Sequence, residues 1–188
     1  MAEVNENRSF AASDFLNHPY PDAESNAAIL LPHLKPTDKI LDFRCGSGII
    51  AISLASRVPH GAVVGIDFAP NVISKARASL VDHYRWRATY PPGHQHPPEG
   101  AIIFHLVDSI VKLPYDDNTF DVVYASDMFI QIVTETLSVE VLKEMMRVLK
   151  FDGFLFTRDI AKQHLFPSNL GFGTQLTQNL LRCFCRSD

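Results

Sequence analysis

The chain has 188 residues, of which 46% are hydrophobic and 20% are charged, and its formal net charge is −4. This composition is ordinary for one well-buried domain, and it offers no basic patch for nucleic acid or for an anionic membrane surface. No apolar run reaches the ~18 residues of a membrane span, and the first 25 residues are too polar for a signal peptide. We therefore expect one cytoplasmic domain over residues 1–188 that binds neither nucleic acid nor membrane.

Apolar runs of strand length alternate with helical patterns along the chain. After an N-terminal segment (1–23), these patterns predict helices at 24–34, 47–57, 70–83 and 135–149, and strands at 39–43, 62–67, 101–107, 120–125 and 153–158. The alternation is typical of βαβ units with right-handed crossovers. We expect a doubly wound, Rossmann-like α/β fold with a mostly parallel sheet.

One segment interrupts this order. Residues 84–100 contain Pro91, Pro92, Pro97 and Pro98, and so many prolines are incompatible with a regular helix or strand. We predict an exposed insertion there. Its histidines have no cysteine or carboxylate cluster at ligand spacing beside them, so the sequence predicts no metal site.

The most informative motif is the turn after the first strand. That strand (39–43) carries Asp42 as its last residue but one and is followed by Arg44-Cys45-Gly46-Ser47-Gly48, and the second strand (62–67) ends at Asp67. In an open α/β sheet, the amides of such a turn bind the anionic part of a nucleoside ligand, and the second acid binds its ribose. The dinucleotide pattern G-x-G-x-x-G fails, because Arg44 and Ile49 occupy two of its glycine positions. The shorter D-x-G-x-G-x-G pattern fits, with Arg44 in place of its first glycine.

Four blocks in the same order carry a family resemblance: LDFRCGSG at 41–48, GIDFAPNVISKAR at 65–77, VDSIVKLPYDDNTFDVVYAS at 107–126 and LKEMMRVLKFDGFLFTRD at 142–159. Over about residues 24–160 the chain resembles a class I S-adenosylmethionine-dependent methyltransferase of the small-molecule type. It is similar to the ubiquinone and menaquinone biosynthesis methyltransferases and to their relatives in secondary metabolism. The resemblance implies S-adenosylmethionine as cofactor and a small organic metabolite as methyl acceptor.

The resemblance also assigns roles to residues of the turn and of the second strand. Asp42 would fix the turn or reach the methionine amino group, and Gly46 and Gly48 would let the backbone approach the methionyl moiety. Asp67 would hold the ribose diol by charge-assisted hydrogen bonds, although such an acid can also serve as a helix N-cap. The cofactor-binding residues expected in all are Asp42, Arg44, Gly46, Ser47, Gly48, Asp67, Phe68, Asp108, Ser109 and Ser126.

The remaining assignments follow the later strands. Phe68 would lie against the adenine, and Asp108, with Ser109 beside it, would accept a hydrogen bond from the adenine amino group or stay a solvated strand-end acid. Ser126 would lie at the carboxyl edge, where such sheets meet their ligands. Asp127 and His164 are candidate general bases, although methyl transfer from a sulfonium depends mainly on positioning.

Arg44 departs from the family pattern and supports two opposite hypotheses. A left-handed backbone costs an L-residue about 1–2 kcal/mol, so Arg44 could damage the site. A guanidinium beside the cofactor carboxylate could instead form a forked ion pair.

The C-terminal tail (161–188) is the second departure, because the family normally adds a helix and an antiparallel hairpin after the fifth strand. We expect that hairpin to be missing here, and the spacing of apolar residues predicts a short amphipathic helix at 174–184. The fifth strand would then be an edge, which a homodimer, a partner subunit or the tail itself should cover.

These two departures leave two other functions open. One is a pseudo-methyltransferase that acts as a binding subunit. The other is a cofactor-independent isomerase or cyclase on the same fold.

Overall fold

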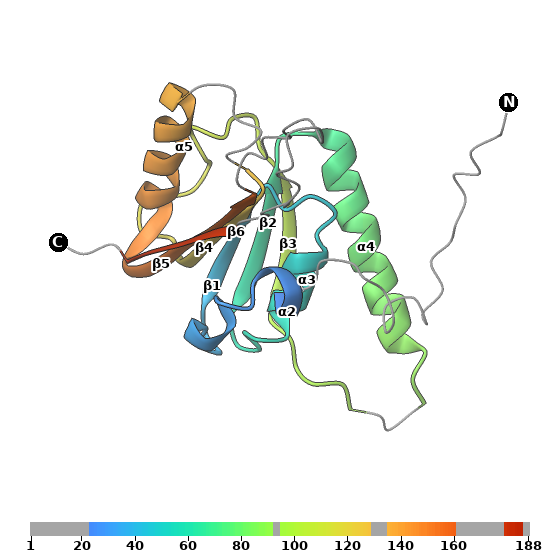
Figure 1. Cartoon of the computed structure of the whole chain (residues 1–188). Coiled ribbons are helices and arrows are strands. Elements are labelled where there is room, and N and C mark those ends of the chain that lie inside the picture. Colours follow the sequence, from blue (N-terminus) through green and yellow to red (C-terminus); the bar gives the residue numbers. More distant parts are fainter. Residues whose placement is uncertain (1–22, 92–94, 129–134, 161–178, 186–188) are drawn as a thin grey trace, which may run out of the picture.

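The computed structural model describes residues 23–91, 95–128, 135–160 and 179–185. They form one sheet with the strand order β3-β2-β1-β4-β5-β6 (Figure 1). The first five strands are parallel, and β6 pairs antiparallel with β5. The strands are β1 (Lys39–Phe43), β2 (Ala62–Asp67), β3 (Ala101–Leu106), β4 (Phe120–Ser126), β5 (Leu149–Ile160) and β6 (Asn179–Cys185). The predicted Rossmann-like α/β fold is confirmed, and the predicted bounds of β1 and β2 are correct.

Helices cover both faces of the sheet. Figure 1 shows α3 and α4 on one side and α5 on the other. Alternate residues of each strand supply the two buried clusters between these layers, so Ile40 packs toward α3 whereas Leu41 and Phe43 pack toward α5. The helical segments are α2 (Ala23–Asn26), the 3-10 turn η1 (Leu31–His33), α3 (Ile49–Ala55), α4 (Pro70–Ala88) and α5 (Glu135–Val148).

The predicted helix at 24–34 is wrong in its length. α2 ends at Asn26, and η1 follows separately with Pro32 in its first turn. Pro32 has no amide hydrogen to donate to the Ala28 carbonyl, so an α-helix is not continued through this position. α2 is held by tertiary contacts instead. The amide of Ala23 donates to the Ser53 hydroxyl at 3.2 Å, and the buried Tyr124 hydroxyl donates to the Asn26 carbonyl at 2.9 Å.

The predicted insertion at 84–100 needs a similar correction, because α4 continues to Ala88. The residues that return from the proline-rich segment are bound to the end of this helix. Glu99 accepts from Arg87 at 2.8 Å and lies 2.9 Å from a ring nitrogen of His83. Trp86 packs edge-on against Tyr90. These contacts use side chains of the last turns of α4, which explains why the helix extends beyond residue 83.

The predicted helix at 174–184 is also wrong over its described part. Residues 179–185 form β6, and each of them pairs with a residue of β5 between Phe154 and Ile160. The open backbone groups of β5 favour a strand over the helix that the apolar spacing suggested. Because β6 covers this edge, β5 gives no structural reason for a homodimer or partner subunit there. Residues 174–178 lie outside the described part.

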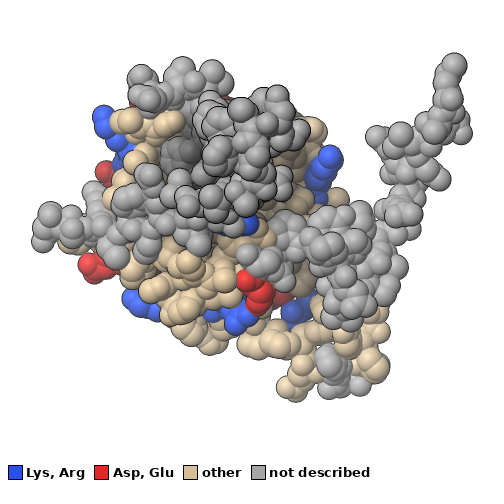
Figure 2. Space-filling view, viewed as in Figure 1, with Lys and Arg blue, Asp and Glu red and all other residues tan. Residues whose placement is uncertain are grey.

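The described surface matches the mild charge of the chain. On the face seen in Figure 2, basic and acidic side chains are interspersed, and neither sign forms one large field. None of the described helices has the length and apolar character that a membrane crossing requires.

Phe104 of β3 fills a space that two glycines leave open between the sheet and its helices. A Cβ on Gly48 would lie 2.5 Å from the Phe104 Cζ, and a Cβ on Gly65 would lie 2.6 Å from two atoms of the same ring. Both distances are far below van der Waals contact. Glycine at these positions therefore allows α3 and β2 to pack directly against Phe104.

We predict that Gly65→Ala lowers the free energy of unfolding by about 1–3 kcal/mol, the usual cost of overpacking a core. Urea unfolding measures the loss. Phe104→Leu should relieve the clash, so the double variant should lose less stability than the sum of the two single variants. Strict additivity would show that the ring does not oppose the added methyl group.

Candidate functional site

The glycine turn connects β1 to α3 and lies beside the end of β2. The Cys45 amide donates to the Ile66 carbonyl at 2.9 Å, which fixes the turn to β2. Three of its residues have left-handed backbones, namely Arg44 (φ 60°), Gly46 (φ 55°) and Gly48 (φ 78°). Two of the three are glycines, for which this conformation carries no steric cost.

The two glycines of the turn have different surroundings. A Cβ on Gly46 would meet no atom of the described residues within 4 Å, whereas a Cβ on Gly48 would collide with Phe104. Gly46 therefore exposes backbone to open space that a ligand can enter, and Gly48 serves helix packing. Ser47 between them is exposed.

Asp42 and Asp67 lie buried at the ends of neighbouring strands, with 3% and 4% of their surface exposed. Asp67 Oδ1 accepts a hydrogen bond from the Ala69 amide at 3.0 Å, which forms an Asx-type turn. Ala69 is the N-cap residue of α4. Asp42 Oδ2 has no hydrogen-bond partner among the described residues. Neither carboxylate forms an ion pair with a described residue, so the candidate site holds two buried acids without a cation.

Burial dominates the protonation of Asp42. Burial raises the pKa of this carboxyl, a hydrogen bond from the Ala51 amide opposes the shift, and the neighbouring Asp67 charge adds to it, so that the pKa lies at about 7. Burial also raises the pKa of the Cys45 thiol, and the charges of Asp42 and Asp67 add to that effect. The buried acids at the ends of β1 and β2 thus create a negative electrostatic field in a site that is shielded from water.

Arg44 does not neutralise this field. Its guanidinium carbon lies 5.1 Å from the centre of the Phe68 ring, and its Nε is buried with no hydrogen-bond partner in the part of the chain that the structure describes. Neither sequence hypothesis for Arg44 anticipated this stacking. Phe68 itself keeps 47% of its surface exposed.

The predicted adenine-side residues follow β3. The Val107 amide donates to the Asp67 carbonyl at 3.0 Å, which joins the ends of β2 and β3. Asp108, the next residue, is exposed, and the Ser109 hydroxyl accepts from the Val111 amide at 3.2 Å. The structure therefore brings Asp108 to the same edge as Asp67 and leaves its side chain accessible.

Ser126 and Asp127 end β4 at the same edge. The Ser126 hydroxyl donates to Asp127 Oδ2 at 3.2 Å, and the Asp127 amide donates to the Arg158 carbonyl of β5 at 2.7 Å. Asp127 has a left-handed backbone (φ 51°), a costly conformation for a residue other than glycine. The other candidate base, His164, lies outside the described residues.

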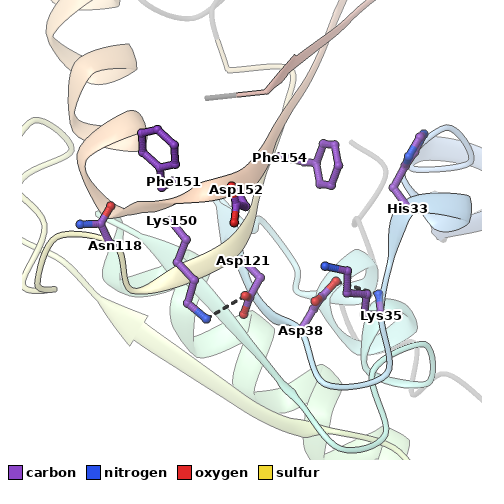
Figure 3. Close-up of a pocket in the computed structure, with 9 residues that line it drawn as sticks. All are labelled: His33, Lys35, Asp38, Asn118, Asp121, Lys150, Phe151, Asp152 and Phe154. Carbon is purple, nitrogen blue, oxygen red and sulfur yellow. Dashed lines mark hydrogen bonds and ion pairs between the residues drawn. The ribbon is translucent and has the colours of Figure 1, made fainter. Parts of the chain in front are cut away.

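A cavity of about 600 Å³ lies at the opposite, amino-terminal edge of the sheet (Figure 3). Two of its acids, Asp38 and Asp121, accept hydrogen bonds. Asp121 binds Lys150 at 2.7 Å and the Lys39 amide at 2.9 Å. Burial alone would raise the pKa of Asp121, but these bonds outweigh it and lower the pKa. No sequence motif predicted this cavity, which is lined by His33, Lys35, Asp38, Asn118, Asp121, Lys150, Phe151, Asp152 and Phe154. Within the described parts of the chain, no group of three or more histidines, cysteines or acids is placed to hold a metal.

Comparison with known proteins identifies the family. A family model described as "Methyltransferase domain" matches residues 40–153, which include the glycine turn and the ends of β1 to β4. The chain belongs to the class I S-adenosylmethionine-dependent methyltransferases. Proteins of this family use S-adenosylmethionine. The resemblance seen in the four sequence blocks is thus confirmed.

Individual relatives agree with this assignment. A probable methyltransferase, ltbC, of Aspergillus luteorubrus is 35% identical over 88% of this chain and 55% of its own length. A 2-phytyl-1,4-naphtoquinone methyltransferase of Trichormus variabilis is 36% identical over 62% of this chain and 44% of its own. A crystal structure of a methyltransferase from Methanosarcina mazei superposes with a TM-score of 0.59 at 26% identity, covering 70% of this chain and 57% of that one. The chain spans about half the length of the curated relatives it matches.

The protonation of Asp42 predicts how stability depends on pH. Its pKa is 3.8 as a model carboxyl and about 7 when folded, so between these values the folded chain binds more protons than the unfolded chain. Stability should therefore fall as pH rises from about 4 to 7, by up to about 4 kcal/mol, and then level off with respect to this group.

Urea unfolding at pH 5 and pH 8 measures this loss. Asp42→Asn keeps an oxygen for the Ala51 amide but cannot ionise, so it should lose much less stability than the wild type between the two pH values. An equal loss in both proteins would show that another group causes the pH dependence.

Proposed function

We propose that the chain binds S-adenosylmethionine at the carboxyl ends of β1 to β4 and transfers its methyl group to a small organic molecule. The observation that carries this proposal is the pair of buried carboxylates, Asp42 and Asp67, beside the open backbone of Gly46. A buried acceptor left without a partner costs about 1–3 kcal/mol, and a buried charge costs more. A ligand with a cationic amino group and ribose hydroxyls would satisfy both acids.

The arrangement of these residues suits that ligand. Asp42 Oδ2, which has no partner in the described part of the chain, would accept from the amino group of the methionyl moiety. Asp67 keeps its orientation through the Ala69 amide, so its carboxylate would accept from the ribose hydroxyls with little loss of side-chain entropy. The bound cofactor would supply an electrophilic methyl group on a sulfonium.

The chain's own contribution to methyl transfer is then positioning and exclusion of water. Phe68 and Asp108 would hold the adenine at the ends of β2 and β3. Asp127, held by the Ser126 hydroxyl at 3.2 Å, is our candidate for removing a proton from an oxygen or nitrogen acceptor. The name of the naphthoquinone methyltransferase relative supports an aromatic acceptor as the first class to assay.

Isothermal titration with S-adenosylhomocysteine tests the cofactor site. We expect the wild type to bind and Asp67→Asn to weaken binding by about 1.5–3 kcal/mol, the worth of hydrogen bonds to a charged group. The asparagine keeps an oxygen for the Ala69 amide, so its thermal midpoint should stay close to that of the wild type. Asp67→Ala should lose the same affinity and also some stability.

Asp82→Asn is the matched control. Asp82 lies on α4 and forms an exposed ion pair with Arg85 at 3.3 Å, so this variant should bind as the wild type does. Absence of binding by the wild type at millimolar ligand would refute the proposed function. Full affinity in Asp67→Asn would refute the assignment of Asp67.

A further inference from the structure

Arg44 occupies the position of the turn at which the D-x-G-x-G-x-G pattern has its first glycine. It keeps the left-handed backbone that the turn requires, at φ 60°, although a side chain makes this conformation costly. The fold therefore does not avoid the strain at this position. A compensating contact of the side chain is expected, and the contact that the structure shows is with Phe68.

The direction of the guanidinium distinguishes the possible roles of Arg44. It forms no ion pair with Asp42 or Asp67, although both acids border the same turn. Its carbon lies instead 5.1 Å from the centre of the Phe68 ring, within the range of a cation–π contact.

Phe68 is well placed to use this support. It directly follows Asp67, whose side chain is fixed by the Ala69 amide, and it remains 47% exposed with Arg44 against its ring. A large apolar ring half open to solvent beside a ribose-binding acid is a suitable stacking surface for a base. An exposed ring without a neighbour would lose rotamer entropy on binding, whereas a ring already held by Arg44 loses less.

We propose that Arg44 is a positioning residue that holds the Phe68 ring as the stacking platform for the adenine of the ligand. This inference rests on the proposed function of the site. It explains why arginine is compatible with the place of a glycine: the guanidinium lies behind the platform and not in the ligand's path. Arg44 then acts through Phe68 and makes no hydrogen bond to the ligand.

Arg44→Gly separates binding from stability. Glycine adopts the turn conformation without strain, so the thermal midpoint should stay within about 4 °C of the wild type. The affinity should nevertheless fall, by roughly twofold to tenfold, because the cation–π contact that holds Phe68 is gone. A residue with a merely structural role would not lose affinity while stability is kept.

A double-mutant cycle with Phe68→Ala tests whether Arg44 acts through the ring. Phe68→Ala should weaken binding about fivefold or more, and Arg44→Gly should have no further effect in that background. Titrations with S-adenosylhomocysteine and with adenosine should give the same loss for Arg44→Gly, because both ligands carry the adenine. Asp82→Asn again serves as the control.

Each of the following results would overturn the inference. Tighter binding by Arg44→Gly would mean that the guanidinium obstructs the ligand. A loss confined to S-adenosylhomocysteine would mean that Arg44 binds the ligand carboxylate, and a full loss in the Phe68→Ala background would mean that it contacts the ligand directly. If Asp67→Asn weakens binding but Arg44→Gly does not, only this inference is wrong. If the wild type binds neither ligand, the proposed function fails as well.

Discussion

The candidate site depends on the parallel pairing of β1 with β2. In this register Asp42 lies opposite Gly65, and Asp67 follows two residues later on the same face of the sheet. Parallel strands end at one edge, so two acids that are distant in sequence come together there. Because α3 covers this face, both carboxylates are buried beside the turn instead of being solvated.

The close approach of α3 and α4 to the sheet has its own physical cause. Phe104 fills the space above Gly48 and Gly65, where a Cβ would lie 2.5 to 2.6 Å from the ring. The glycine turn therefore has two tasks that belong to different residues. Gly48 permits dense packing, as Gly65 of β2 also does, whereas Gly46 leaves the backbone accessible. A glycine motif read from sequence alone does not separate these tasks, since every glycine in it has the same letter.

Elements with a strong local sequence signal were predicted correctly, whereas elements that depend on tertiary contacts were not. The strands at 39–43 and 62–67 were predicted correctly because both are short apolar runs that end at an acid, a local signal. The segment at 179–185 was not, because its conformation depends on the free edge of β5 and not on its own apolar spacing. The end of α4 depends likewise on contacts with Glu99. At the site, the placement of Asp67 followed from strand order, but the contact of Arg44 with Phe68 depends on side-chain directions that sequence does not encode locally.

The two edges of the sheet show why the carboxyl edge is the one suited to a cationic ligand. At the amino edge, Asp121 has Lys150 and the Lys39 amide as partners, and its pKa is lowered. At the carboxyl edge, Asp42 keeps one oxygen without a partner, and its pKa is raised. Without a ligand, the protein is therefore destabilised at the carboxyl edge by the buried carboxyl of Asp42, which a ligand can satisfy. Any ligand that brings a positive charge to Asp42 must lower the pKa of that carboxyl and stabilise the fold at the same time, since binding to the native state alone shifts the folding equilibrium. Ligand affinity and folding stability are thus coupled through this carboxylate, and a variant that removes the buried charge should gain stability in the free chain at the expense of the ligand.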